Sequence, residues 1–193
     1  MRSRRLVRTW IALALVAGLG LAGCEADEEP PAAAPDYETA LAGAPPPLAA
    51  VHAQSNELID AGPEGYREAI AELRGYPIVV NVWASWCGPC RAEFPHFQQV
   101  AAQLGKRVAF LGLDSDDNDD AARTFLRDHP VPYPSYTDPD KRIATELEAT
   151  FGLPATAFYN REGERVHTKH GGYATEADLL ADIRTHALGR ESG

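Results

Sequence analysis

Beyond about residue 56 the chain alternates between two hydrophobic patterns. Short apolar runs rich in Val and Ile are typical of buried central strands, and apolar residues recurring every three or four positions predict helices. The pattern predicts, in order, a helix over 63–73, a strand over 78–83, a helix over 89–104, a strand over 108–113, helices over 121–128 and 139–150, strands over 155–159 and 165–169, and a helix over 175–188. Strands that alternate with helices, then a hairpin and a closing helix, indicate an α/β fold with a central mixed sheet and helices on both faces.

Polar residues mark several boundaries of these elements. Thr175 and Asp178 form an S/T-x-x-D start for the last helix, and Asp119 or Asp120 can cap the helix over 121–128. The acidic run 114–120 invites comparison with a calcium loop, but an EF-hand needs Gly at its sixth position and Glu at its twelfth. Those positions hold Asp119 and Phe125, so we interpret the run as a strand-end loop with a helix cap.

The first residues have the pattern of a targeting segment. Four arginines precede an uncharged apolar run over 10–22. This run is shorter than the ~20 residues that a membrane-spanning helix needs, and it suits the core of a signal peptide. We therefore predict that residues 1–23 are a signal peptide. Residues 24–55 are rich in proline, alanine and acids, a composition that predicts an extended or disordered tether before a domain over 56–193.

Charge and cysteine content narrow the possible functions. The chain has 193 residues, enough for one ordinary domain, and a formal net charge of -10, which argues against a nucleic-acid partner. Its three cysteines are Cys24, Cys87 and Cys90. Three are too few for a disulfide framework or a four-cysteine zinc site, so we expect one working pair and one cysteine with a separate role.

The pair lies where a strand passes into a helix, in the sequence Trp-Ala-Ser-Trp-Cys-Gly-Pro-Cys over 83–90. The free N–H groups and the macrodipole at a helix start favour a thiolate, the reactive form, at Cys87. Cys90, one turn later, is close enough to form a disulfide, and Pro89 suits the first turn. We expect Cys87 to attack a substrate disulfide and Cys90 to resolve the mixed disulfide. The alternatives are half of a zinc site and an inert structural disulfide.

The stretch from Val79 to Pro95 resembles the thioredoxin fold, and more closely its extracytoplasmic TlpA/ResA-like branch, over roughly residues 75–188. The resemblance implies a cis proline at Pro154, beside the disulfide. It also implies that the backbone of Leu153 pairs with a bound substrate chain. Around the cysteines, Trp86, Gly88 and Pro89 would form the substrate-facing surface. No cofactor and no metal is implied.

The same resemblance suggests a proton acceptor and one departure. Glu93 lies where this branch keeps a buried glutamate, whereas Asn81 stands where cytosolic thioredoxins have an aspartate. Glu93 would take the proton of Cys90; the alternative is a solvent-facing helix glutamate. The family commonly opens with a β-hairpin, but the stretch before Tyr76 looks helical.

The sequence Leu-Ala-Gly-Cys at 21–24 resembles a bacterial lipobox. The resemblance implies cleavage before Cys24 and a lipid on that cysteine, which would anchor the protein outside the cytoplasm on the bacterial cell membrane. The alternative is an ordinary signal peptide, or a short span, with a cysteine there by chance.

These features predict a reductase for the disulfides of exported proteins such as apocytochrome c, kept reduced by a membrane electron donor. A disulfide oxidase or isomerase is the first alternative. A peroxidase of the related peroxiredoxin group is another, but it needs T-x-x-C and Ala84 stands at the threonine position. A non-catalytic lipoprotein that uses the fold as a scaffold is the last.

Overall fold

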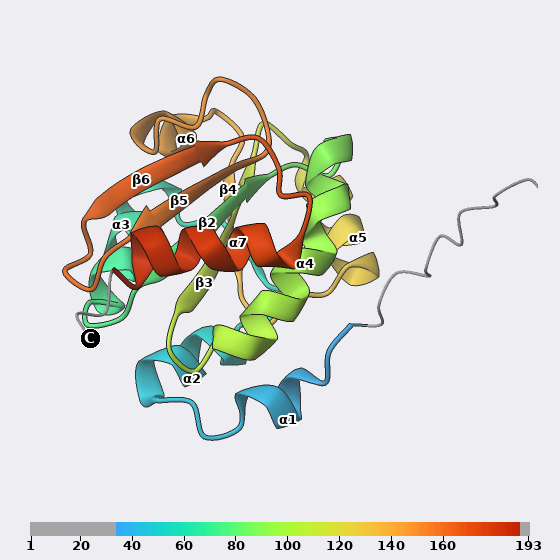
Figure 1. Ribbon diagram of the computed structural model, residues 1–193. Coiled ribbons are helices and arrows are strands. Elements are labelled where there is room, and N and C mark those ends of the chain that lie inside the picture. Colours follow the sequence, from blue (N-terminus) through green and yellow to red (C-terminus); the bar gives the residue numbers. More distant parts are fainter. Residues whose placement is uncertain (1–33, 190–193) are drawn as a thin grey trace, which may run out of the picture. The chain divides into compact units, whose positions relative to one another are not determined.

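The computed structural model describes residues 34–189, which form a six-stranded mixed sheet with helices around it (Figure 1). The strand order is β1-β4-β3-β2-β5-β6. The strands are β1 (Leu58–Ile59), β2 (Ile78–Trp83), β3 (Ala109–Ser115), β4 (Ser135–Asp138), β5 (Ala155–Tyr159) and β6 (Arg165–His170). β1 to β4 run parallel to one another, whereas β5 is antiparallel to both of its neighbours, β2 and β6.

The helices are α1 (Tyr37–Leu41), α2 (Pro46–Ala53), α3 (Gly62–Glu72), α4 (Gly88–Leu104), α5 (Asp119–Asp128), α6 (Arg142–Glu146) and α7 (Glu176–Asp182), and a π-helical turn η1 (Ile183–Ala187) continues α7. All six side chains of β2 are buried. Successive side chains of a strand point to opposite faces, so the sheet is covered on both sides at β2. The predicted α/β fold class is thus confirmed.

An aromatic cluster joins the sheet to two helices close to the active-site motif. The ring of Trp83, at the end of β2, lies 5.3 Å from that of Phe94 in α4 and 5.2 Å from that of Phe125 in α5. Trp83 is fully buried and its indole N–H donates to the hydroxyl of Ser135 at 3.2 Å. This packing fixes the segment from which the motif begins.

Two helix predictions need correction. The helix expected over 139–150 is only Arg142–Glu146, because Lys141 before it and Glu148 after it adopt positive φ angles of 57°. The strand β4 just before it was not predicted. The cap of α5 is Asn118, whose side chain accepts from the backbone N–H groups of Asp120 and Ala121, and neither of the two aspartates expected.

The tether predicted over 24–55 is wrong for its described part. Residues 34–55 contain α1 and α2, and Leu48 of α2 is fully buried in the core. His52 ties α2 to the domain, because its two ring nitrogens lie 3.0 Å and 2.9 Å from the carbonyl oxygens of Pro132 and Gly105. The prolines at 45–47 precede or begin α2, where a missing N–H does no harm. The domain therefore starts well before residue 56.

The signal peptide 1–23, the lipidation site Cys24 and the rest of the tether lie outside the described residues. Within 34–189 no helix is long and apolar enough to cross a membrane. The described segment before Tyr76 is mostly helical, as expected, since it contains α1, α2 and α3, but it also contains the two-residue strand β1, which was not predicted.

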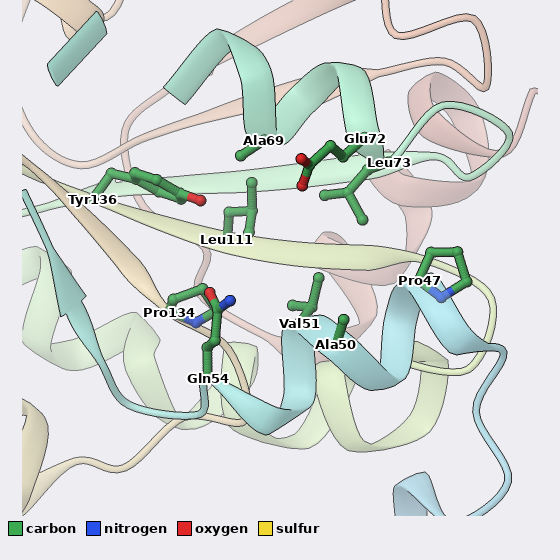
Figure 2. Close-up of a pocket in the computed structure, with 10 residues that line it drawn as sticks. All are labelled: Pro47, Ala50, Val51, Gln54, Ala69, Glu72, Leu73, Leu111, Pro134 and Tyr136. Atoms are coloured by element: carbon green, nitrogen blue, oxygen red, sulfur yellow. The ribbon is translucent and has the colours of Figure 1, made fainter. Parts of the chain in front are cut away.

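A small cavity lies between α2, α3 and the sheet (Figure 2). Its volume is about 120 Å³, and Val51, Leu73 and Leu111 are among its lining residues. None of its lining residues belongs to the cysteine motif or to the segment around Pro154. The cysteine motif lies away from this cavity, where β2 passes into α4.

Candidate active site

The two cysteines of the motif form a disulfide at the start of α4. Cys87 is the N-cap residue, with an extended backbone, and its Sγ accepts the N–H of Cys90 at 3.2 Å. The Cα atoms of Cys87 and Cys90 are 5.2 Å apart. The same N–H would stabilise a thiolate at Cys87 after reduction, because it points at the sulfur and lies at the positive end of the helix dipole.

The surroundings of the disulfide differ on its two sides. Cys90 is fully buried and Cys87 is 3% exposed, whereas Gly88 and Pro89 are exposed in the first turn of α4. Trp86 is 61% exposed and donates from its indole nitrogen to the carbonyl oxygen of Asp116 at 2.9 Å. An incoming sulfur can therefore approach from the surface that carries Trp86, Gly88 and Pro89.

Pro154 lies at the same edge of the sheet. The peptide bond between Leu153 and Pro154 is cis, as the resemblance implied. β5 begins at the next residue, Ala155, which pairs with Val82 near the end of β2. The backbone of the half-buried Leu153 thus precedes the first residue of the ladder, where an extended substrate chain could pair with it.

Glu93 lies one turn after Cys90, so both side chains occupy one face of α4. It is fully buried, which excludes the solvent-facing alternative. Its Oε2 accepts the backbone N–H of Tyr173 at 3.0 Å, while Oε1 has no hydrogen-bond partner in the described part of the chain. Burial raises the pKa of Glu93 to about 7, against the opposing effects of the Tyr173 N–H and the charge of Lys169.

Gly172 shows how close these groups are. A Cβ atom placed on Gly172 would lie 3.4 Å from Glu93 Oε2, 3.4 Å from Pro154 Cγ and 3.8 Å from the carbonyl oxygen of Pro89. The start of α4, the cis proline and the buried glutamate therefore all lie close to Gly172.

A second acidic group at this edge was missed by the sequence reasoning. Asp117, in the loop after β3, accepts hydrogen bonds from both the backbone N–H and the hydroxyl of Ser85, two residues before Cys87. Asp114, at the end of β3, is 2% exposed, and burial and the nearby Asp117 raise its pKa to about 8. A signal for these residues was available in the sequence: the predicted strands 78–83 and 108–113, if parallel, end at the same edge of the sheet, so the acidic loop after the second strand lies close to the cysteine motif after the first.

Asn81 is also buried and is paired with Thr156 across β2 and β5. Its amide oxygen and nitrogen have no hydrogen-bond partners among the described residues. An asparagine cannot take up the proton of Cys90, whereas Glu93, on the same buried face of α4 as that cysteine, can. Within 34–189 no group of three His, Cys, Asp or Glu side chains is placed to hold a metal ion.

A thioredoxin-like fold with a Cys-x-x-Cys disulfide at a helix start and a cis proline beside it defines a thiol–disulfide oxidoreductase. The comparisons agree: the model of the AhpC/TSA family matches residues 53–167, and the chain belongs to this family. The thiol:disulfide interchange protein DsbE of Escherichia coli K12 is 31% identical over 71% of this chain and 69% of its own length. ResA of Bacillus anthracis, a thiol-disulfide oxidoreductase, is 26% identical over 53% of this chain and 60% of its own.

A solved structure gives the same result. The secreted Mycobacterium tuberculosis disulfide oxidoreductase homologous to E. coli DsbE superposes with a TM-score of 0.52 at 26% identity, over 58% of this chain and 84% of that one. The predicted relationship to ResA-like oxidoreductases is thus confirmed. The chain spans about two thirds of the length of these two curated relatives.

Proposed function

We propose that this protein reduces disulfides of exported proteins outside the cytoplasm, with Cys87 as the nucleophile and Cys90 as the resolving cysteine. The observation that carries the proposal is the asymmetry of the pair. Cys87 caps α4 beside exposed residues, whereas Cys90 is fully buried one turn before Glu93.

The cycle starts from the reduced pair. The Cys87 thiolate attacks one sulfur of the substrate disulfide, which forms a mixed disulfide and releases the other substrate sulfur as a thiolate that takes a proton from water. Glu93 then accepts the proton of the Cys90 thiol. The Cys90 thiolate attacks the Sγ of Cys87, and the second substrate sulfur leaves. The substrate has gained two electrons, and Cys87 and Cys90 are again a disulfide.

The two protonation equilibria suit these steps. Helix-start N–H groups favour the thiolate of Cys87 without any acidic partner. The Cys90 thiol is fully buried, which disfavours its thiolate, so it needs a base. A carboxyl whose pKa is about 7 is both deprotonated often enough to accept a proton near neutral pH and basic enough to hold it.

The amino-terminal sequence and one relative support a location outside the cytoplasm for this chemistry. The basic and apolar segment 1–23 and the Cys24 lipobox support export and a lipid anchor on the bacterial cell membrane. The mycobacterial relative is described as secreted, which supports the same side of the membrane. Substrates would be exported thiol proteins such as apocytochrome c, and a membrane thiol–disulfide relay would supply the electrons.

The reduction potential tests the direction of electron flow. Equilibration of the full chain with defined dithiol and glutathione buffers should give a value close to that of thioredoxin, about -270 mV. A value close to that of the oxidant DsbA, about -120 mV, would overturn the reducing role and favour an oxidase.

Trapping tests the two cysteine roles. Cys90→Ser should accumulate mixed disulfides with exported proteins through Cys87, whereas the matched Cys87→Ser variant should trap none. Absence of trapped partners from Cys90→Ser would favour a non-catalytic scaffold.

A further inference from the structure

The loop between β6 and α7 covers Glu93 and is fastened by one lysine. Lys169, in β6, donates from its Nζ to the carbonyl oxygens of Gly171 at 2.7 Å and Gly172 at 3.1 Å. The same Nζ lies 4.4 Å from the centroid of the Tyr173 ring, in a cation–π arrangement. A single ammonium thus contacts three consecutive residues of the loop.

This loop supplies the hydrogen bond that Glu93 receives. The backbone N–H of Tyr173 donates to Glu93 Oε2, and Gly172 lies against both Glu93 and Pro154. The N–H of Gly171 donates to the carbonyl oxygen of Pro154 at 2.9 Å. Movement of the loop would therefore disturb the buried carboxylate and the cis-proline segment together.

The far end of the loop is held independently of Lys169. The hydroxyl of Tyr173 donates to Asp182 Oδ2 of α7 at 2.9 Å. Lys169 therefore contacts the face of the Tyr173 ring, and Asp182 binds the hydroxyl of the same side chain. Loss of Lys169 would loosen the backbone of 171–173, which would then be held to the domain by the hydrogen bonds of Gly171 to Pro154 and of Tyr173 to Glu93 and Asp182.

We propose that Lys169 is a positioning residue for the proton transfer from Cys90: it holds the Tyr173 N–H on Glu93 and its charge favours the Glu93 carboxylate. The proposal rests on the proposed role of Glu93 as the proton acceptor. Lys169 touches neither cysteine in this arrangement and acts through the loop and through its charge.

The other groups that face Glu93 do not supply this effect. Tyr133, which follows α5, is fully buried and neutral, because burial raises its pKa well above the ordinary value. Tyr173 is likewise neutral, its pKa raised by burial and by Asp182. The carboxyl of Asp182, which accepts the hydroxyl of Tyr173, supplies no positive charge. Lys169 is the cation whose charge lowers the pKa of Glu93 against the effect of burial.

The test separates the two steps of disulfide exchange in the full chain with a Cys24→Ser background. The reduced protein is mixed with the aromatic disulfide 5,5′-dithiobis(2-nitrobenzoate). Attack by Cys87 releases one thionitrobenzoate, and attack by Cys90 on the mixed disulfide releases the second. The rate of the second release, measured from pH 5 to 9, reports the proton transfer from Cys90.

Lys169→Met retains the aliphatic stem and removes the charge and the three donors. We expect the pH midpoint of the second release to rise by about half a unit or more, which makes this step about threefold slower below the midpoint. The first release should be unchanged. Lys169→Gln keeps a donor without the charge and should give an intermediate shift of the midpoint. If near-ultraviolet circular dichroism shows that the methionine variant is not folded, Lys169→Gln replaces it in the test.

Lys106→Met is the matched control, because it removes the same charge from a lysine that donates to Ala42 at the surface. It should leave both phases unchanged. An unshifted midpoint in Lys169→Met, with Glu93→Gln removing the pH dependence, would overturn the role of Lys169 and leave that of Glu93 intact. If Glu93→Gln also leaves the profile unchanged, the proposed role of Glu93 itself fails.

Discussion

Asp117 accepts both the backbone N–H and the hydroxyl of Ser85, and so joins the loop after β3 to the segment that leads into Cys87. Trp86 adds a second tie, from its indole N–H to the carbonyl oxygen of Asp116. These contacts exist because β2 and β3 are parallel, which places their carboxyl ends at one edge of the sheet. The residues before the nucleophile are therefore held by the neighbouring strand's loop.

Asp117→Ala should destabilise the protein by about 1–3 kcal/mol, because the Ser85 N–H and hydroxyl lose a charged acceptor in a half-buried position. Urea unfolding measures the free energy. Asp140→Ala is the control, since Asp140 is exposed in a turn, and it should change stability by less than about 0.5 kcal/mol. Equal stabilities of the two variants would show that the contact with Ser85 contributes nothing.

Glu93 makes stability depend on pH in a defined window. Its pKa is 4.5 when unperturbed and about 7 in the fold, so between these values the folded state holds the proton more tightly than the unfolded state. Its contribution is fully present below about pH 4.5 and is lost as the pH rises through 7. The wild type should therefore lose about 3 kcal/mol relative to Glu93→Gln between pH 4.5 and 8. Urea titrations of both proteins at these two pH values test this; a constant difference would contradict it.

Asp114 also makes the protein less stable as the pH rises, over a wider pH range than Glu93 does. Burial and the nearby Asp117 raise its pKa from 3.8 to about 8. Between these pH values the folded state therefore holds the proton of Asp114 more tightly than the unfolded state does. Relative to Asp114→Asn, the wild type should lose stability as the pH rises through 8. The side-chain carboxyl ¹³C signal of Asp114, assigned by its absence from Asp114→Asn, should shift with a midpoint close to 8. A pH-independent signal would show that Asp114 does not titrate there.

Leu48 tests whether α2 belongs to the folded domain. Leu48→Ala should destabilise the protein by about 2–5 kcal/mol, because the side chain is fully buried against the core. Val166→Ala, at a side chain that is 47% exposed, is the control and should cost well under 1 kcal/mol. A small effect at Leu48, matching that at Val166, would mean that 46–53 does not pack on the domain in solution.

The sequence predicted β2, α4 and the cysteine motif well because their signals are local: a continuous apolar run, a proline in the first helical turn and a thiol at the cap. Cys90, Glu93, Phe94 and Phe97 also recur at helical spacing, so the burial of Glu93 could have been read from the pattern alone. The cap of α5 was misplaced because Asn118 is as good a cap as the aspartates that follow it.

Other features depend on contacts between distant residues. Leu48 and Val51 are two apolar residues within a Pro- and Ala-rich stretch, and only the domain surface against which they pack makes α2 stable. The positive φ angles of Lys141 and Glu148 shorten α6 without any glycine to announce them. The contact between Asp117 and Ser85 joins residues 32 positions apart and follows from the register of β2 and β3, which the local pattern does not specify.

The helices α1 and α2 pack at the end of α4 that is remote from the disulfide. Both helices lie near the last turn of α4, where a Cβ atom on Gly105 would contact Leu41 and His52 (Figure 1). Cys87 stands at the opposite end of this helix, roughly 27 Å from Gly105 along the helix axis at 1.5 Å per residue. The first described helices therefore pack far from Cys87, and a partner that docks at the disulfide does not meet them.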